Sequence, residues 1–308
     1  MEKSNVVNRI LFKDYYQSVA TRLARDEDWS DRHHKDTLAK AKVFATFVYN
    51  GKPIGEYYVD ELTAIIIEAF TDWLSREGNT RLKKGVCNGT QNRYLSMISV
   101  LLKKAVKLNY TDTYPAFSWK TESKGRPRYY SEEEQQKLFE FFRTDKTYSK
   151  YPWIRYCLTL GLKTGMRLGE IQKLDNGQAE IIKDEVGDEL IYIKKGKNGD
   201  ERFIPIVLEE VAEAVHKIHN SNSFNHHILY KGLWKAKKVI APNDPHFNFH
   251  VTRHTCASEM ANEAKENLKN IAEYLGHRSL NTTTKYVHVS LSAKKEAAKR
   301  RMNARSVA

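Results

Sequence analysis

The stretch IYIKKGKNGDERFIPI at residues 191–206 interrupts a chain whose other periodic segments have helical spacing. Its ends, IYI and FIPI, are short runs rich in the β-branched and aromatic residues that favour strands. Between them, Gly196 and Gly199 in GKNGD suit a turn that joins two antiparallel strands. The stretch therefore predicts a β-hairpin inside a mainly α-helical chain, which is a fold of the α+β class with a small antiparallel β-sheet.

Helical segments are expected on both sides of this hairpin. Ser131 and Glu134 form the pattern of a capping box, which favours the start of a helix. Apolar spacing predicts helices over residues 131–143, 150–163 and 167–174 before the hairpin, and over 208–219, 250–264, 267–275 and around Tyr286 after it. The second half of the chain is thus expected to be one mixed domain.

The first 120 residues predict a helical bundle with its apolar stripes in the core. Helices are expected over about 11–24, from Ser30 to near Gly51, from Asp60 to about Leu74, and after Thr90 through about 105. The polar and basic segment TESKGRPRYYSEEE follows, and its glycine and proline break the periodicity at about 119–130. We therefore place the linker here and expect two domains, residues 1–120 and 121–308.

The composition favours a globular protein with a polyanionic partner. The 308 residues are 41% hydrophobic, and the formal net charge is +13. Such an excess suits nucleic acid or an anionic membrane surface. A membrane partner is not expected, because no run of about 18 apolar residues occurs. The three cysteines lie far apart, with neither disulfide nor metal-ligand spacing, so a cytoplasmic location is expected.

Four short segments carry side chains that suit chemistry: TGMRLGEI at 164–171, KNGDERFIP at 197–205, HVTRH at 250–254 and LGHRSLNTTTKYVHV at 275–289. Each is a weak signal alone. His250 and His254 lie four apart, as two zinc ligands on one helical face would. The metalloprotease pattern, however, needs a glutamate directly after the first histidine, and position 251 is valine. We therefore expect no metal.

Taken together, these segments resemble the tyrosine recombinase (phage integrase) family. That family has an arginine in T-G-x-R-x-x-E, a hairpin lysine eight residues before a proline, an H-x-x-R pair, and a tyrosine nine residues after the histidine of L-G-H. The six matching residues here are Arg167, Lys197, His250, Arg253, His277 and Tyr286. The resemblance implies an N-terminal helical, SAM-like, core-binding DNA-binding domain and a C-terminal tyrosine-recombinase catalytic domain.

The residue types suit attack on a phosphodiester. Arg167 and Arg253 stay protonated, and the planar guanidinium can hold two phosphate oxygens at once. The resemblance gives His277 a hydrogen bond to the scissile phosphate. Such preorganised cations could take the place of a metal in stabilising the transition state.

Proton transfer is the second requirement. Tyr286 would form a 3′-phosphotyrosine bond, but a phenol with a reference pKa near 10 needs a base. We expect His250 to supply that base. The resemblance makes Lys197 the general acid for the departing 5′-oxygen. The chain has neither a P-loop nor a G-x-G-x-x-G segment, so no cofactor is expected.

The resemblance also implies partners: double-stranded DNA recombination sites, self-association to a tetramer on DNA, and a DNA-bending accessory protein in some systems. A nucleoid-associated location follows. The favoured role is integration or excision of a phage or mobile element, since KYVHV around Tyr286 departs from the YTHV associated with chromosome-dimer resolution. A chromosome-dimer-resolving recombinase, a type IB topoisomerase-like enzyme and a non-catalytic DNA-binding regulator are the alternatives.

Overall fold

A computed structural model of the chain describes residues 9–27, 29–78, 84–122, 128–194, 201–277 and 279–286. The chain divides into two compact units, Met1–Lys124 and Gly125–Ala308. The boundary expected from the sequence, between residues 120 and 121, lies close to this division. None of the helices within the described ranges is both long and apolar enough to cross a bilayer.

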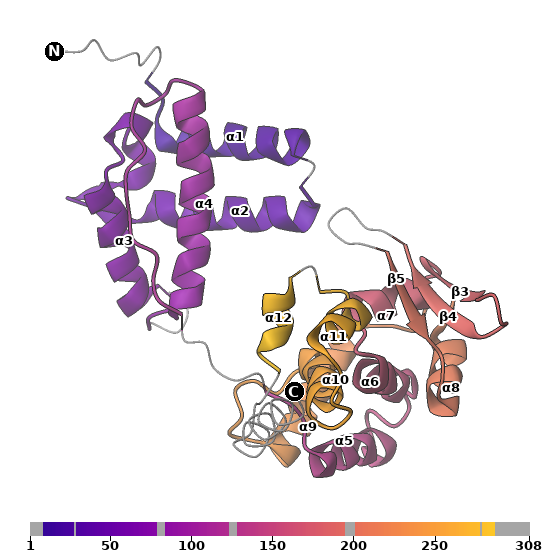
Figure 1. Cartoon of the computed structure of the whole chain (residues 1–308). Coiled ribbons are helices and arrows are strands. Elements are labelled where there is room, and N and C mark those ends of the chain that lie inside the picture. The colour runs from indigo at the N-terminus through magenta and orange to yellow at the C-terminus, as the bar shows by residue number, and fades with distance from the viewer. Residues whose placement is uncertain are drawn as a thin grey trace, which may run out of the picture. The chain divides into compact units, whose positions relative to one another are not determined.

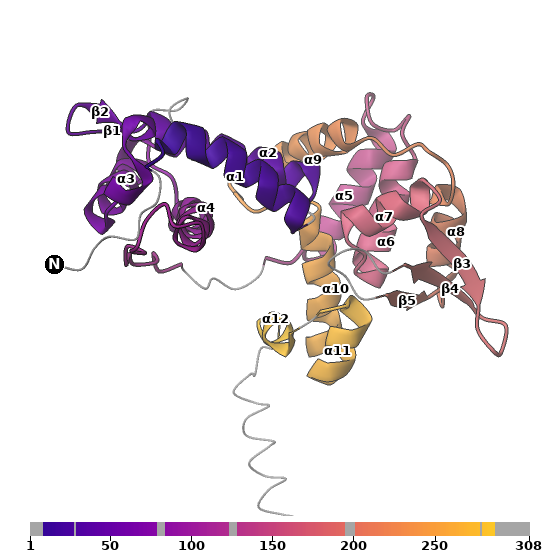
Figure 2. The same cartoon turned by 90° about the horizontal axis from the view of Figure 1, so that it is seen from above.

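The first unit is a helical bundle with a small hairpin. Its elements are α1 (Phe12–Asp26), α2 (Asp31–Thr46), β1 (Val48–Tyr49), β2 (Lys52–Pro53), η1 (Ile54–Glu56), η2 (Val59–Glu61), α3 (Ala64–Glu77) and α4 (Asn88–Lys107). Helices α1 and α2 lie side by side, and α4 crosses them steeply (Figures 1 and 2). Their apolar stripes face one another and form a core of their own.

Two predicted helix ends in this unit can be checked directly. Ser30 caps α2 as expected, because its side chain accepts a hydrogen bond from the backbone N–H of His33. The cap expected at Asp60 is wrong: α3 begins at Ala64, after an extended Thr63. The carboxylate of Asp60 instead accepts a hydrogen bond from Arg9 Nε at 3.0 Å, so it does not cap a helix.

The second unit combines helices with one three-stranded sheet. Its helices are α5 (Glu132–Thr144), α6 (Trp153–Thr164), α7 (Leu168–Asp175), α8 (Glu209–Ile218), α9 (His226–Ile240), α10 (His250–Asn262), α11 (Leu268–Leu275) and α12 (Leu280–Thr284). Its strands are β3 (Ala179–Lys183), β4 (Glu189–Ile193) and β5 (Arg202–Pro205), antiparallel in that order. The α+β class and the hairpin of β4 and β5 are therefore confirmed. The turn between these strands, at 195–200, lies outside the described residues.

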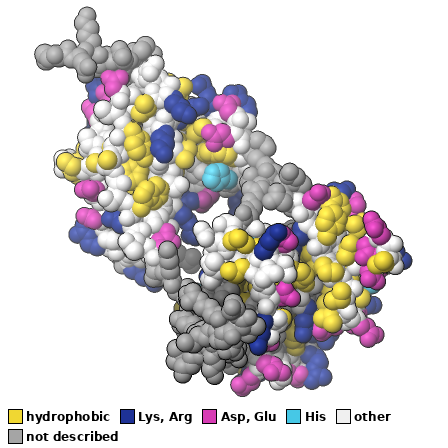
Figure 3. Space-filling view, in the orientation of Figure 1, with side chains coloured by type: hydrophobic (Ala, Val, Ile, Leu, Met, Phe, Trp, Pro, Cys, Tyr) yellow, Lys and Arg dark blue, Asp and Glu magenta, His cyan; other side chains and the backbone are white. Residues whose placement is uncertain are grey.

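Charged side chains of both signs are scattered over the face of the molecule in Figure 3. Figure 3 shows acidic and basic side chains intermingled on the visible face of each unit. The described side chains on this face therefore form no large patch of one sign.

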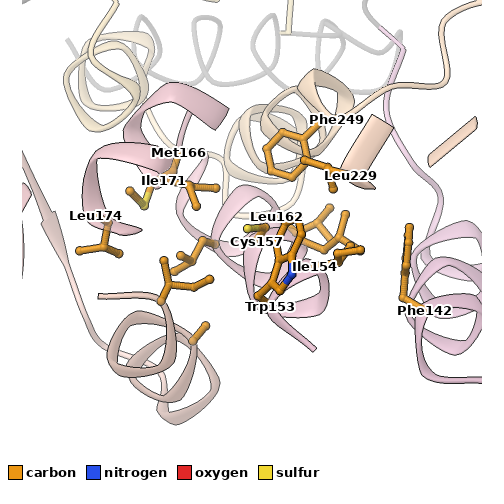
Figure 4. Packing of buried hydrophobic residues seen from close by; sticks show 14 of the residues in the cluster. Phe142, Trp153, Ile154, Cys157, Leu162, Met166, Ile171, Leu174, Leu229 and Phe249 are labelled. Carbon is orange, nitrogen blue, oxygen red and sulfur yellow. The ribbon is translucent and has the colours of Figure 1, made fainter. Parts of the chain in front are cut away.

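Helix α6 lies at the centre of the second unit's core. Side chains are buried all around it, which is typical of a helix enclosed by other elements. It contacts α5, α7, α8 and α10. Figure 4 shows Trp153, Ile154 and Cys157 of α6 among side chains from several neighbouring elements. This enclosure holds the C-terminal end of α6 in place, and the candidate site begins there.

Two elements of the second unit were not predicted, β3 and α9. Helix α9 carries Gly232 near its middle, and glycine weakens a helix by about 1 kcal/mol relative to alanine. The packing explains this glycine: a Cβ there would lie 2.8 Å from the ring of Phe142. Strand β3, AEIIK, lacks clear alternation and gains its stability from pairing with β4 along its whole length.

Candidate active site

Two helices end next to each other at the site, and each ends in a left-handed glycine. Gly165 follows α6 with φ of 62°, and Gly276 follows α11 with φ of 65°. Glycine adopts this conformation with the least strain, and it is the common terminator of helices. A Cβ at Gly165 would also lie 2.5 Å from Leu275 Cδ2. The T-G and L-G pairs in the sequence are thus explained by two tightly packed helix ends.

Three guanidinium groups bind the C-terminal end of α11. The carbonyl oxygen of residue 274 accepts a hydrogen bond from Arg202 at 2.8 Å. That of residue 275 accepts from Arg253 at 2.5 Å, and that of residue 276 accepts from Arg167 at 2.9 Å. These carbonyls have no partner within the helix and carry the negative end of its dipole. Three arginines from three other segments of the chain therefore bind the C-terminal end of α11.

The end of α6 holds two of the same arginines. Arg253 Nη1 donates to the carbonyl of Gly165 at 2.7 Å, and Arg202 Nη2 donates to that of Thr164 at 3.1 Å. The Arg253 side chain is 1% exposed, so its orientation is set by these carbonyls. Each of the two arginines ties the two helix ends together.

Glu170 joins two of the three cations. Its carboxylate accepts from Arg167 Nη1 and from Arg202 Nη1, both at 2.8 Å, and from the backbone N–H of Arg167. Arg253, in contrast, has no ion pair with a carboxylate within the described part of the chain. Its burial, with Arg167 and Arg202 close by, lowers its pKa to about 10. The cluster keeps an excess of positive charge, which suits an anionic ligand.

Tyr286 lies against this cluster with its hydroxyl enclosed. The side chain is 2% exposed, and burial raises its pKa to about 12, although Arg253 acts in the opposite direction. Its hydroxyl lies 2.5 Å from Nδ1 of His254. The ring of His277 is stacked on it, with a centroid distance of 6.3 Å and an interplanar angle of 12°. The side chain of Tyr286 is therefore a neutral phenol, with the imidazole rings of His254 and His277 beside it.

Of the two predicted histidines, His277 lies beside this phenol and His250 lies beside His254. Burial and then Arg253 lower the pKa of His277 to about 4, and its Nδ1 lies 2.8 Å from the Thr283 hydroxyl. His250 is the first residue of α10, and its ring meets that of His254 edge-on at 4.6 Å. Burial lowers the pKa of His250 as well, and the positive charge of Arg253 lowers it further. These rings are neutral near pH 7.

Five of the six predicted site residues gather here: Arg167, His250, Arg253, His277 and Tyr286. Lys197 lies outside the described residues. Sequence reasoning missed two residues at the site, Arg202 and His254. In the structure His254, and not His250, contacts the hydroxyl that was expected to need a base.

A sequence signal existed for one of the two missed residues, Arg202. For His254 the sequence offers only its spacing from His250, which would suit two zinc ligands on one helical face. Within the described ranges, no group of three or more His, Cys, Asp or Glu side chains could hold a metal ion. Side chains two positions apart on a strand point to the same face of the sheet. Arg202 is two positions before Ile204, whose side chain faces the core, so the alternation along β5 predicts that Arg202 also points inward.

Comparisons with known proteins identify the family of this chain. The profile of the phage integrase family matches residues 128–292, and that of the phage integrase SAM-like domain matches residues 11–121. The shufflon-specific DNA recombinase of Escherichia coli is 28% identical over 248 residues, covering 77% of this chain and 60% of the relative. Tyrosine recombinase XerA of Pyrococcus furiosus is 28% identical over 187 residues, covering 56% of this chain and 62% of XerA.

Solved structures share the fold. A lambda integrase tetramer bound to a Holliday junction aligns with a TM-score of 0.69 and 16% identity, over 92% of this chain and 79% of that one. The Tn1549 transposon integrase, in complex with a circular intermediate DNA, aligns with a TM-score of 0.66 and 16% identity, over 94% and 99%. The matches to curated relatives span less than two thirds of their lengths. Because the family profile covers more than half of the chain, the protein belongs to the phage integrase family, the tyrosine recombinases.

Proposed function

We propose that the chain is a site-specific DNA recombinase that cuts and rejoins DNA through a 3′-phosphotyrosine bond to Tyr286. The observation that carries the proposal is the phenol of Tyr286 beside the guanidinium groups of Arg253, which is buried, and Arg167, which is partly exposed; a phosphate would complement their charge. Arg167 and Arg253 would hold the non-bridging oxygens, whose charge increases during attack. The similarity to a shufflon-specific DNA recombinase also supports DNA as the substrate.

The reaction needs no external energy. The Tyr286 oxygen forms a bond to phosphorus as the bond from phosphorus to the 5′-oxygen breaks. The 5′-oxygen leaves with the electron pair and takes a proton, for which Lys197 is the proposed donor. A 5′-hydroxyl from another strand then attacks the phosphotyrosine, which releases Tyr286 and completes the exchange. His277 is proposed to hydrogen-bond the phosphate.

The proposed partners are double-stranded recombination sites and three further copies of the chain. The lambda integrase whose fold this chain shares was seen as a tetramer on a Holliday junction. Residues 1–120 are proposed as the core-binding DNA-binding domain and residues 121–308 as the catalytic domain. Action on chromosomal DNA places the protein in the cytoplasm with the nucleoid, and a DNA-bending protein is an expected accessory.

Integration or excision of a phage or mobile element is the proposed outcome. The likeness to the integrases of lambda and Tn1549 favours it. Resolution of chromosome dimers is the second candidate, favoured by the similarity to XerA. Two substrates separate these outcomes. A plasmid with two copies of the recognised site reports resolution, and a plasmid with one site mixed with a circular donor reports integration; the more efficient reaction identifies the role.

The decisive experiment is covalent trapping on DNA. A duplex sequence that the chain itself selects from a randomised pool is nicked next to the cleavage position, so that the released fragment diffuses away. The wild-type chain should then accumulate as a covalent protein–DNA species in the presence of EDTA. An equal yield with Tyr286→Phe, or a block by EDTA, would overturn the mechanism.

Variants of the guanidinium cluster separate catalysis from binding. Arg167→Ala and Arg253→Ala should lose adduct formation by 100-fold or more, on the order of one transition-state contact, and keep most of their affinity for the duplex. A regulator without catalysis would bind the site and form no adduct even as wild type. A topoisomerase-like enzyme would relax supercoiled plasmid as a monomer, without needing a second site.

A further inference from the structure

His254 is the side chain in contact with the attacking atom. Its Nδ1 lies 2.5 Å from the Tyr286 hydroxyl oxygen, and the two rings lie 5.4 Å apart at 44°. His250, one helical turn earlier on α10, has its ring against that of His254 and makes no hydrogen bond to Tyr286. The sequence expectation gave the proton of the phenol to His250, whereas the contact belongs to His254.

We propose that His254 is a catalytic residue that accepts the hydroxyl proton of Tyr286 as the phenol attacks the phosphate. This inference rests on the proposed function, since it concerns the same nucleophile. Arg253 and His254 are neighbours on α10. In this proposal Arg253 binds the phosphate and His254 takes the proton of Tyr286.

The charge state fixes the direction of the hydrogen bond. Burial, followed by the charges around it, lowers the pKa of His254 to about 3, while burial raises that of Tyr286 to about 12. Both groups are therefore neutral near pH 7, so the phenol donates and Nδ1 accepts. The ring proton of His254 then resides on Nε2.

The proton balance of the step is simple. As the bond between the Tyr286 oxygen and phosphorus forms, the O–H proton moves to Nδ1 and gives an imidazolium. The electron pair of the broken phosphorus–oxygen bond leaves with the 5′-oxygen, which is protonated by its own donor. In the reverse step the imidazolium returns its proton to the departing phenol, so one histidine serves both directions.

The surroundings would make this base stronger when DNA arrives. The groups that face His254 are His250 and Arg253 from α10, His277 after α11, and Lys285 and Tyr286 after α12. After burial, the cationic and imidazole groups among them are what lower the pKa of His254. A phosphate bound by Arg253 offsets that positive field, so the imidazole would bind a proton more readily only with substrate in place.

The test uses the full chain, single-turnover adduct formation, and the nicked duplex selected by the chain. His254→Ala removes the acceptor. His254→Asn keeps an oxygen close to the position of Nδ1, so it preserves a hydrogen bond but cannot take a proton. The control is His216→Asn, an exposed histidine on α8 that contacts Glu189.

Both His254 variants should form the adduct about 100-fold more slowly at pH 7, the usual size of a general-base contribution. The deficit should shrink as the pH is raised toward 10, because hydroxide can then remove the proton; a purely structural defect would persist at every pH. His216→Asn should match the wild type. Thermal unfolding within a few degrees of wild type shows that the variants are folded.

Two results would overturn the inference. Rates within threefold of wild type for His254→Ala would show that the contact is not used. A wild-type rate for His254→Asn, with His254→Ala slow, would show that His254 only positions the phenol. Failure of the proposed function looks different, since the wild-type chain itself would then form no adduct.

Discussion

His254 and His277 are held neutral by the folded state, and this links stability to pH. Their pKa values are lowered to about 3 and about 4 in the folded chain, against about 6.5 when unfolded. Below pH 6.5 the unfolded chain binds protons that the folded chain does not, so the free energy of unfolding falls as the pH falls. Each ring contributes at most about 1.4 kcal/mol for each pH unit below 6.5, until its folded pKa is reached.

The measurement is urea unfolding between pH 7 and 5. Carboxylates also titrate in acid, so the comparison is between wild type and His254→Asn, which lacks one of the two rings. The loss of stability from pH 7 to 5 should be smaller in the variant by about 1 to 2 kcal/mol. Parallel pH profiles for the two proteins would contradict a neutral, buried His254.

At the scale of the elements, Arg202 joins β5 to the ends of α6 and α11. It donates to one carbonyl at each helix end and to Glu170, and it is 6% exposed. Removal of one partner from a buried ion pair costs about 3 to 5 kcal/mol, because the remaining polar groups lose their partner without regaining water. Arg202→Met should therefore lower the free energy of unfolding by about this amount, measured by urea denaturation.

An exposed arginine supplies the matched control. Arg143 pairs with Glu140 on α5, and both side chains are more than half exposed. Arg143→Met should change stability by less than about 1 kcal/mol. Equal losses in the free energy of unfolding for the two substitutions would show that the hydrogen bonds of Arg202 to the two helix ends do not stabilise the folded chain.

The helix ends can be tested through their glycines. Gly165→Ala forces a side chain into a left-handed backbone and against Leu275, so about 2 kcal/mol or more of stability should be lost. Gly169→Ala lies inside α7, where a Cβ meets nothing within 4 Å, and should gain up to about 1 kcal/mol. Thermal unfolding of the two variants should move in opposite directions; a shared direction would show that backbone conformation is not what selects Gly165.

Local patterns predicted most of these elements, and long-range packing explains the misses. The capping box at Ser131 and Glu134 forms as expected, because both bonds are made within one turn. Helix α9 escaped prediction because Gly232 is selected by the ring of Phe142, which lies far away in sequence. The same holds for Asp60, whose carboxylate is engaged by Arg9.

The same difference between local patterns and long-range contacts applies to the residues of the site. Motif spacing pointed to Arg253 and Tyr286, which the fold brings together. The partner of the Tyr286 hydroxyl is 32 positions away, and neither local propensity nor spacing distinguishes His254 from His250. Burial of Arg202 likewise depends on which face of β5 meets the helices, and that face is set by the pairing of Ile204 with Ile191.

For the whole molecule, the net charge of +13 leads to a prediction about salt. Each phosphate neutralised by a lysine or arginine releases counterions, so the logarithm of the binding constant falls by about 0.9 per contact for each logarithm of salt concentration. A chain that engages DNA through 6 to 10 phosphates should lose roughly 1,000-fold to 100,000-fold in affinity between 50 and 200 mM salt.

Fluorescence anisotropy of the full chain on its selected duplex measures this slope. Arg253→Ala should lower the slope by about one contact, because the guanidinium is proposed to hold a phosphate. Arg143→Met, far from the cluster in sequence and exposed on α5, is the control and should keep the wild-type slope. A slope near zero for the wild type would mean that the positive charge serves something other than the DNA backbone. The covalent adduct, once trapped, should in contrast survive high salt, because a phosphotyrosine bond does not depend on counterions.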